Sequence, residues 1–203
     1  MFNSIHKRCT KQNQVILVLL LISILFSACA ANQGGKEGES DSQTIIVTSF
    51  YPMYIFTINI VGDVPGVRVV NMTQNQADCL HDYQLTTKDL KTLQEADIFV
   101  YNGAGMEDFL DKVISQLPNL KLIEASKDIP LIENPDGTAN PHVWVSVSGA
   151  IAQVKNIAEG LIEADPANSG RYEKNALEYI ERLEALKEKM HEELENISNR
   201  DII

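Results

Sequence analysis

Short apolar runs and amphipathic stretches alternate along the chain from Thr44 onward. The apolar runs are rich in β-branched residues, which predicts strands over 45–47, 67–72, 97–101 and 120–123. The stretches between them repeat apolar residues at steps of three and four, which predicts helices over 52–61, 86–93, 106–117 and 146–162. Strands that alternate with helices at this spacing predict an α/β fold, with a four-stranded and mostly parallel sheet that has helices on both faces.

The final segment, 168–199, carries the most regular apolar repeat of the chain. Its aromatic and aliphatic residues recur at steps of three and four, which predicts one helix about 48 Å long at 1.5 Å per residue. A coiled coil and packing across a globular domain both fit such a stripe, and the preceding α/β body favours the second. After this helix, Ile202 and Ile203 look like the start of another strand, so we expect the protein to continue beyond Ile203.

The first 28 residues follow the order of a secretory signal peptide: a basic head that includes His6, an apolar run over 15–26, and the small pair Ser27-Ala28. The exit over 26–29 resembles a bacterial lipobox, in which Cys29 is lipidated and becomes the first residue of the mature chain. Plain cleavage and secretion is the alternative. Residues 29–43 therefore predict a lipidated cysteine followed by a flexible, solvated tether, because Gly, Ser and charged residues dominate this segment.

Composition narrows the function classes. Hydrophobic residues make up 44% of the 203 positions and charged residues 22%, which is typical of a globular protein. The net charge of −11 disfavours nucleic-acid binding, because an acidic surface repels phosphate backbones. No apolar run reaches the roughly 18 residues that a membrane-spanning helix needs. Cys9 leaves with the signal peptide and Cys29 is expected to carry lipid, so Cys79 is the one remaining thiol and no internal disulfide is predicted.

Two histidines fall in loops that follow a predicted strand and precede a predicted helix. His81 follows the second strand and His142 the fourth. Open parallel sheets bind ligands at their carboxyl edge, where both loops lie, so the two imidazoles are a candidate for half of a four-ligand zinc site. A chance placement of two unrelated loop histidines is the alternative. Cys79 could add a soft third ligand, although a partly buried thiol is the simpler interpretation.

Nothing in the sequence predicts catalysis. The chain has no Gly-x-Ser-x-Gly elbow, and the 102–105 segment lacks the lysine and the glycine spacing of a phosphate loop. His191 opens a His-Glu-x-x pattern, but Glu195 stands where a zinc protease has its second histidine. We therefore expect His191 to be a solvated surface residue.

Four separated motifs occur in a fixed order along the chain: TSFYP at 48–52, HDYQLT at 81–86, NGAGME at 102–107 and NPHVW at 140–144. Together they resemble the solute-binding lipoproteins of bacterial zinc and manganese ABC importers. The resemblance runs from about Thr44 to the end of the chain. It implies two α/β lobes joined by one long helix, with the metal held between the lobes and the loaded receptor docked on a membrane permease.

The resemblance assigns a role to each part of the chain. His81 and His142 match the family's two metal ligands in the N-terminal lobe, here 44–166, and the helix over 167–199 matches the linking helix. The other two ligands of the family, a histidine or glutamate and a carboxylate, belong to a C-terminal lobe, of which 200–203 looks like the start. Since we expect that lobe to lie beyond Ile203, two imidazoles fill only half of a tetrahedral shell here, and we expect this chain alone to capture metal weakly.

The implied function is that of a lipid-anchored, extracytoplasmic receptor that hands Zn²⁺, or alternatively Mn²⁺, to an ABC importer permease. We therefore expect the protein to be neither an enzyme nor a nucleic-acid binder. Two departures from the family pattern stand near the candidate ligands: Thr87 replaces a common proline, and Asn140 replaces a common aspartate.

Two functions of other classes stay open. One is a surface adhesin that uses the long helix as its contact element, and unchanged function after alanine replacement of both His81 and His142 would favour it. The other is a secreted zinc hydrolase, which requires a general base and an open zinc position and would show hydrolysis that chelation abolishes.

Overall fold

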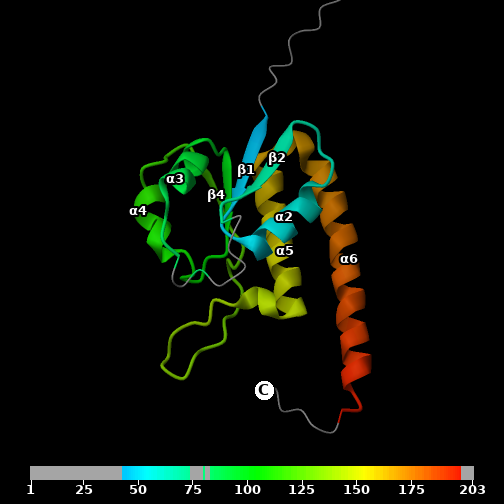
Figure 1. The fold of residues 1–203 in the computed structure, drawn as a ribbon. Coiled ribbons are helices and arrows are strands. Elements are labelled where there is room, and N and C mark those ends of the chain that lie inside the picture. Colours follow the sequence, from blue (N-terminus) through cyan, green and yellow to red (C-terminus); the bar gives the residue numbers. More distant parts are fainter. Residues whose placement is uncertain (1–42, 74–79, 81–82, 198–203) are drawn as a thin grey trace, which may run out of the picture. The chain divides into compact units, whose positions relative to one another are not determined.

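The computed structural model describes residues 43–73, 80 and 83–197, without the side chains of Phe109 and Asp111. All of them belong to one compact unit, 43–203. Figure 1 shows a sheet with helices around it and one helix that extends well beyond the body.

A parallel sheet of four strands forms the centre of this unit. Val47 of β1 pairs with Val70 of β2 on one side and with Phe99 of β3 on the other, and Val100 of β3 pairs with Ile123 of β4. The strand order is β2-β1-β3-β4, so the chain reverses its direction of winding between β1 and β3. The four predicted strands are confirmed, with these bounds: β1 Thr44–Thr48, β2 Val67–Asn71, β3 Ile98–Tyr101 and β4 Lys121–Glu124.

Alternate residues of the central strands face two separate hydrophobic cores, because successive side chains of a strand point to opposite faces. Ile46 and Val100 pack into a larger core, and Val47 and Phe99 into a smaller one; all four are fully buried. The larger core is covered by α2 (Tyr51–Val61), α5 (Val147–Ala164) and α6 (Ser169–Leu194). The smaller core is covered by α3 (Thr87–Gln94) and by the short helices η2 (Asp108–Leu110) and α4 (Asp111–Ile114). The predicted α/β class with helices on both faces is therefore confirmed.

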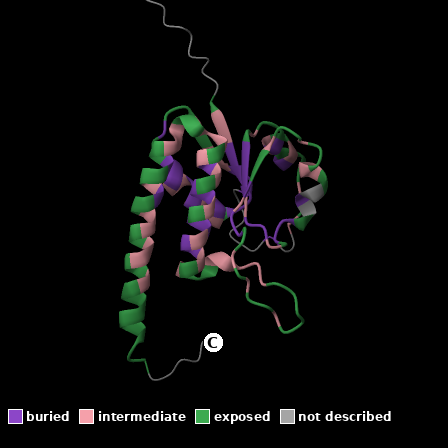
Figure 2. Cartoon of the chain, turned by 180° about the vertical axis from the view of Figure 1, so that it is seen from behind, coloured by how far each residue is buried: buried purple, intermediate pink, exposed green. Residues whose placement is uncertain are grey.

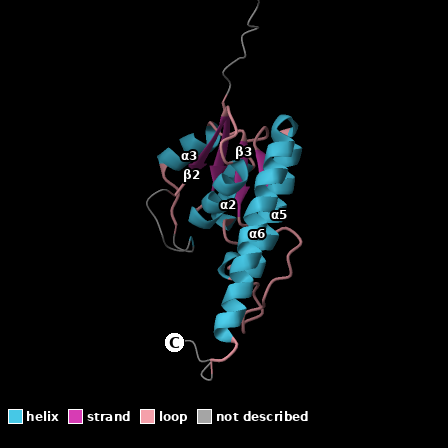
Figure 3. Cartoon of the chain, turned by 90° about the vertical axis from the view of Figure 1, so that its right-hand side faces the viewer, coloured by secondary structure: helices cyan, strands magenta, loops and turns pink. Residues whose placement is uncertain are grey.

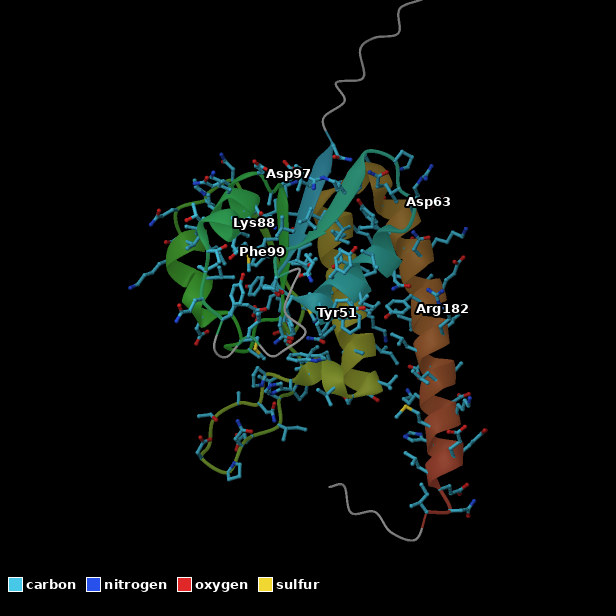
Figure 4. All side chains as sticks on the ribbon, viewed as in Figure 1. Tyr51, Asp63, Lys88, Asp97, Phe99 and Arg182 are labelled. Carbon is cyan, nitrogen blue, oxygen red and sulfur yellow. The ribbon has the colours of Figure 1, made fainter. Side chains whose placement is uncertain are left out.

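The long α6 packs against the body along its first half and as far as Leu183. Tyr172 and Ala176 are buried there, and the side-chain amide of Asn175 donates to the carbonyl of Ile60 in α2 over 3.0 Å. Farther along, the guanidinium of Arg182 donates to the Asn59 side chain, and Figure 4 shows Arg182 on the stretch of α6 beside α2. Figure 3 shows α6 running alongside α5, to which it is joined by η4 (Pro166–Asn168). The apolar stripe of this first half thus packs within the domain.

Most residues of the second half of α6 are exposed, and Figure 2 draws this stretch of the helix mainly in green. Leu186, Met190 and Leu194 are between 41% and 51% exposed. The helix ends at Leu194, before the predicted end at residue 199. Glu193 and Glu195 lie at this end, where the negative pole of the helix dipole disfavours carboxylates.

The helix predicted over 106–117 is largely wrong. Residues 108–114 form only a 3₁₀ turn and a four-residue helix. At its start, Ala104 and Gly105 have positive φ angles and turn the chain instead of opening a helix. At its end, the Ser115 hydroxyl donates to the carbonyl of Lys112, and Pro118 cannot continue a helical ladder.

Within the described residues, every helix is too short or too polar to cross a lipid bilayer.

Candidate metal site

The loop that carries His142 leaves β4 and returns to the sheet before α5 begins. It folds back on itself through an isolated bridge between Glu133 and Ala139, and the Asn140 amide donates to the carbonyl of Ile132 over 2.7 Å. Ser146 caps the start of α5, because its hydroxyl accepts from the Gly149 amide. His142 consequently lies at the carboxyl edge of the sheet, as the sequence predicts.

His142 follows the edge strand β4 in the chain, but its aromatic contacts place it near the middle of the sheet. Its ring lies 5.2 Å from the ring of Trp144, centroid to centroid. Trp144 in turn packs edge-on against Phe50, 4.8 Å away, and Phe50 directly follows β1. Because the winding reverses between β1 and β3, His142 is placed near the switch point where open α/β sheets bind ligands.

The Asn140 side chain fixes the tautomer of His142. Its Oδ1 accepts a hydrogen bond from the backbone N–H of His142 over 3.0 Å, and the same oxygen lies 2.8 Å from Nδ1 of the imidazole. A backbone N–H can only donate, so the atom facing it must be the oxygen, and Nδ1 must then carry the proton. In a neutral imidazole this leaves the lone pair on Nε2, the nitrogen with which a histidine held in this way binds a metal.

A hollow of about 550 Å³ adjoins His142, between the 129–140 loop and the start of α5. Most of its lining is apolar, and Ile132 and Val145 on its rim are 77% and 74% exposed. No carboxylate or thiol belongs to the described lining, so His142 supplies its one strong metal-binding group.

His81 lies outside the described residues, but both of its described neighbours in the sequence are anchored. Leu80 is fully buried in the larger core, against which Trp144 also packs. The Tyr83 amide donates to the carbonyl of Leu80 over 2.9 Å, and the Tyr83 hydroxyl donates to Asp89 over 2.7 Å. Burial, together with the Asp89 carboxylate, raises the pKa of Tyr83, so its hydroxyl keeps its proton and remains a donor.

Asp89 belongs to a capping box that starts α3. Its carboxylate accepts from both the amide and the hydroxyl of Thr86 over 2.7 Å, and the Thr86 hydroxyl accepts from the Asp89 amide. Together with Tyr83, this capping box ties the chain just after His81 to the start of α3.

A buried polar cluster lies under the His142 loop, and the sequence did not predict it. Asn102, Ser126 and Gln153 are all at least 95% buried and hydrogen-bond to one another. Glu107 is buried beside them and accepts from the amides of Asn102 and Gly103. Burial raises the pKa of the Glu107 carboxyl, and these hydrogen bonds oppose that rise. One signal was present: Gln153 is a polar residue on the otherwise apolar face of α5.

The other candidate residues do not join this site. His191 is exposed near the end of α6, as the sequence predicts. Cys79 and the lipidation candidate Cys29 lie outside the described residues. The described part of the chain holds no group of three or more His, Cys, Asp or Glu side chains placed to bind a metal ion.

Comparison with known proteins identifies the family. The model of the family described as "Zinc-uptake complex component A periplasmic" (ZnuA) matches residues 46–203. The chain belongs to the ZnuA family. It is 32% identical to the iron-binding protein YfeA of Yersinia pestis, over 90% of this chain and 58% of YfeA. It is also 32% identical to the high-affinity zinc uptake system protein ZnuA of Bacillus subtilis, over 84% of this chain and 58% of that protein.

Solved structures of ZnuA-like proteins have the same fold. The crystal structure of Zn(II)-bound AdcA from Streptococcus pneumoniae matches with a TM-score of 0.70 and 32% identity, over 78% of this chain and 34% of AdcA. A manganese-binding lipoprotein, MntA of Halalkalibacterium halodurans, is 28% identical over 89% of this chain and 59% of MntA. The chain thus spans a little under 60% of the length of YfeA, the Bacillus subtilis ZnuA and MntA.

The relatives are named for metal binding or metal uptake. The chain is accordingly a member of a family of substrate-binding receptors for zinc, manganese or iron, not of an enzyme family. The zinc-hydrolase alternative loses its support.

Proposed function

We propose that this protein is an extracytoplasmic receptor that binds Zn²⁺ through His81 and His142 and delivers it to the permease of an ABC importer. The observation that carries the proposal is the Asn140–His142 pair. The Asn140 oxygen accepts a hydrogen bond from Nδ1, which keeps the proton on Nδ1 and leaves Nε2 to bind the metal at the edge of the sheet where ligands bind.

His81 is the second ligand in this proposal. Its described neighbours Leu80 and Tyr83 both contact the larger core, against which Trp144 beside His142 also packs. Two imidazoles are half of a tetrahedral zinc shell. Water or protein groups outside the described residues complete it.

Zinc is the ion that the described donors favour. Imidazole suits zinc, whereas manganese prefers carboxylate and carbonyl oxygen, and the described lining of the hollow beside His142 contains no carboxylate. The relatives are named for zinc, manganese and iron, so the choice of ion is part of the proposal.

The membrane attachment rests on Cys29, which we propose carries the lipid. Replacing Cys29 by alanine should move the protein from the membrane fraction to the soluble extracytoplasmic fraction. Continued membrane association of that variant would contradict a lipid anchor at this residue.

Zinc titration of the purified chain by calorimetry tests the proposed site. We expect one zinc per chain, and a loss of affinity of more than about tenfold in both the His142→Ala and the His81→Ala variants, because even an outer-shell partner is worth that much. His191→Ala is the matched control, since it removes an exposed imidazole far along α6 and should leave the titration unchanged. A parallel titration with Mn²⁺ should give weaker binding. If His142→Ala binds zinc as the unchanged chain does, the proposal is wrong.

A further inference from the structure

Asn102 is a fully buried amide whose side chain connects four parts of the chain. Its Nδ2 donates to the carbonyls of Gly103, over 2.9 Å, and Pro141, over 3.0 Å. Its Oδ1 accepts from Nε2 of Gln153 in α5 over 2.8 Å and from the Ser126 hydroxyl over 3.4 Å. A side-chain amide offers two donor hydrogens and two lone pairs, so Asn102 uses its full hydrogen-bonding capacity.

The backbone around Asn102 is held equally firmly. Its amide donates to Oε1 of Glu107 over 2.8 Å, and the next amide, of Gly103, donates to Oε2 over 3.0 Å. The Asn102 carbonyl accepts from the Ser126 amide over 2.9 Å, which extends the pairing of β3 with β4. Gly103 has a φ of 77°, which a residue with a Cβ rarely adopts. The backbone that carries the Asn102 side chain is therefore held firmly in place at the end of β3.

The bond from Asn102 to Pro141 acts on the residue just before His142. Proline has no N–H, so its carbonyl is its one backbone hydrogen-bonding group, and that carbonyl also accepts from the Val143 amide over 2.9 Å. Asn140 holds the imidazole, and Asn102 holds the peptide that leads into His142. The two contacts come from segments 38 residues apart in the sequence (140 − 102).

We infer that Asn102 is a positioning residue for His142: through the Pro141 carbonyl it holds the loop in the geometry that metal binding requires. The inference rests on the proposed function, because it assumes that His142 is a ligand. A ligand on a loop that must first be ordered binds metal less tightly than a ligand held in place beforehand, since ordering costs conformational entropy. Supporting contacts of this kind typically contribute about 10-fold to 100-fold to metal affinity.

The chain contains a matched control for Asn102. Asn156 of α5 also uses its Nδ2 to donate to two backbone carbonyls, those of Ala125 and Lys127, each at a distance of 2.8 Å. These carbonyls belong to the start of the loop after β4, and not to the His142 segment. Asn102→Ala and Asn156→Ala thus remove the same kind of contact, but only the first removes one that holds His142.

The experiment compares the two variants in zinc calorimetry and in ¹⁵N NMR of the histidine side chains of the metal-free protein. Asn102→Ala should weaken zinc binding by about tenfold or more, whereas Asn156→Ala should stay close to the unchanged chain. The His142 signals, assigned by their loss in His142→Ala, should show one tautomer with Nδ1 protonated in the unchanged chain and in Asn156→Ala, and a mixture of tautomers in Asn102→Ala. If Asn102→Ala matches Asn156→Ala in both readouts, the inference is overturned.

A second variant decides the matter if Asn102→Ala does not fold. Gln153→Met has nearly the same volume and removes the donor that binds Asn102 and Ser126. Among the described residues, the Oε1 atom of Gln153 has no hydrogen-bond partner to lose. We expect zinc affinity to fall by about fivefold, the effect of a typical single hydrogen bond; unchanged affinity and an unchanged tautomer would refute the inference. The metal-free NMR also separates the two proposals. If His142 does not bind zinc but its ring loses its single tautomer in Asn102→Ala, the proposed function fails while the positioning by Asn102 stands.

Discussion

Gly160 lies where α5 crosses β4, and a methyl group has no room there. A Cβ at this position would lie 2.7 Å from Cγ2, 2.9 Å from Cγ1 and 3.0 Å from Cδ1 of Ile123, which is itself 5% exposed. Replacing a helical glycine by alanine normally stabilises a protein by about 0.5–1 kcal/mol. Forcing an extra carbon into a packed core costs about 1–3 kcal/mol. The second effect is larger, so Gly160→Ala should lower the free energy of unfolding by about 1 kcal/mol.

Gly170 of α6 is the matched control, because it is exposed and no atom lies within 4 Å of the Cβ it would gain. Gly170→Ala should raise the free energy of unfolding by about 0.5 kcal/mol. Urea denaturation followed by circular dichroism measures both changes, provided that the m-value stays constant. In an Ile123→Ala background, Gly160→Ala should become neutral or stabilising. If Gly160→Ala stabilises the unchanged chain as much as Gly170→Ala does, α5 is not in close contact with β4.

Three further perturbations test other parts of the structure. Asn140→Ala should weaken zinc binding about 10-fold to 100-fold in calorimetry, because the imidazole of the ligand loses the partner that orients it; an unchanged affinity would mean that the tautomer does not matter. Asp89→Ala should lower the free energy of unfolding by about 2 kcal/mol, because it removes the cap of α3 and the acceptor of the Tyr83 hydroxyl. As a control, Asp63→Ala at an exposed position should change the free energy of unfolding by less than about 0.5 kcal/mol. The pKa of Glu107 is raised in the folded protein, so at pH values between the unfolded and the folded pKa the native state binds more protons than the unfolded chain. The contribution of Glu107 to stability is therefore present at acid pH and is lost as the pH rises through the folded pKa. Urea denaturation at a series of pH values should therefore show the unchanged chain losing stability relative to Glu107→Gln as the pH rises, and a difference that is flat or grows in the other direction would refute the assignment.

The strands and most helices could be predicted because each depends on local pattern. The apolar runs at β1 and β3 are buried on both faces, and such runs are visible in the sequence without any knowledge of the fold. The 106–117 segment has an equally helical pattern, but its start is fixed by Glu107 reaching back to the amides of Asn102 and Gly103. That contact depends on the turn after β3, and apolar spacing carries no information about it.

Part of the candidate site could likewise be predicted from the sequence, and part could not. His142 and its place at the edge of the sheet follow from the order of strand, loop and helix. Its support does not, because Asn102 and Pro141 come from loops after different strands and meet only when the chain after β4 crosses back over the sheet. The role of Asn140 also needed the structure, since the sequence shows a departure from the family's aspartate but not that the remaining oxygen still orients the imidazole.

The location of bound zinc is the most direct test of the central claim. Crystals of the protein grown with zinc, with diffraction recorded on both sides of the zinc absorption edge, would place the ion by its anomalous signal. We expect one peak about 2.0–2.1 Å from Nε2 of His142, with an imidazole nitrogen of His81 in the same shell and Nδ1 of His142 still hydrogen-bonded to Asn140. A zinc peak away from His142, for instance among the carboxylates near the end of α6, would contradict it.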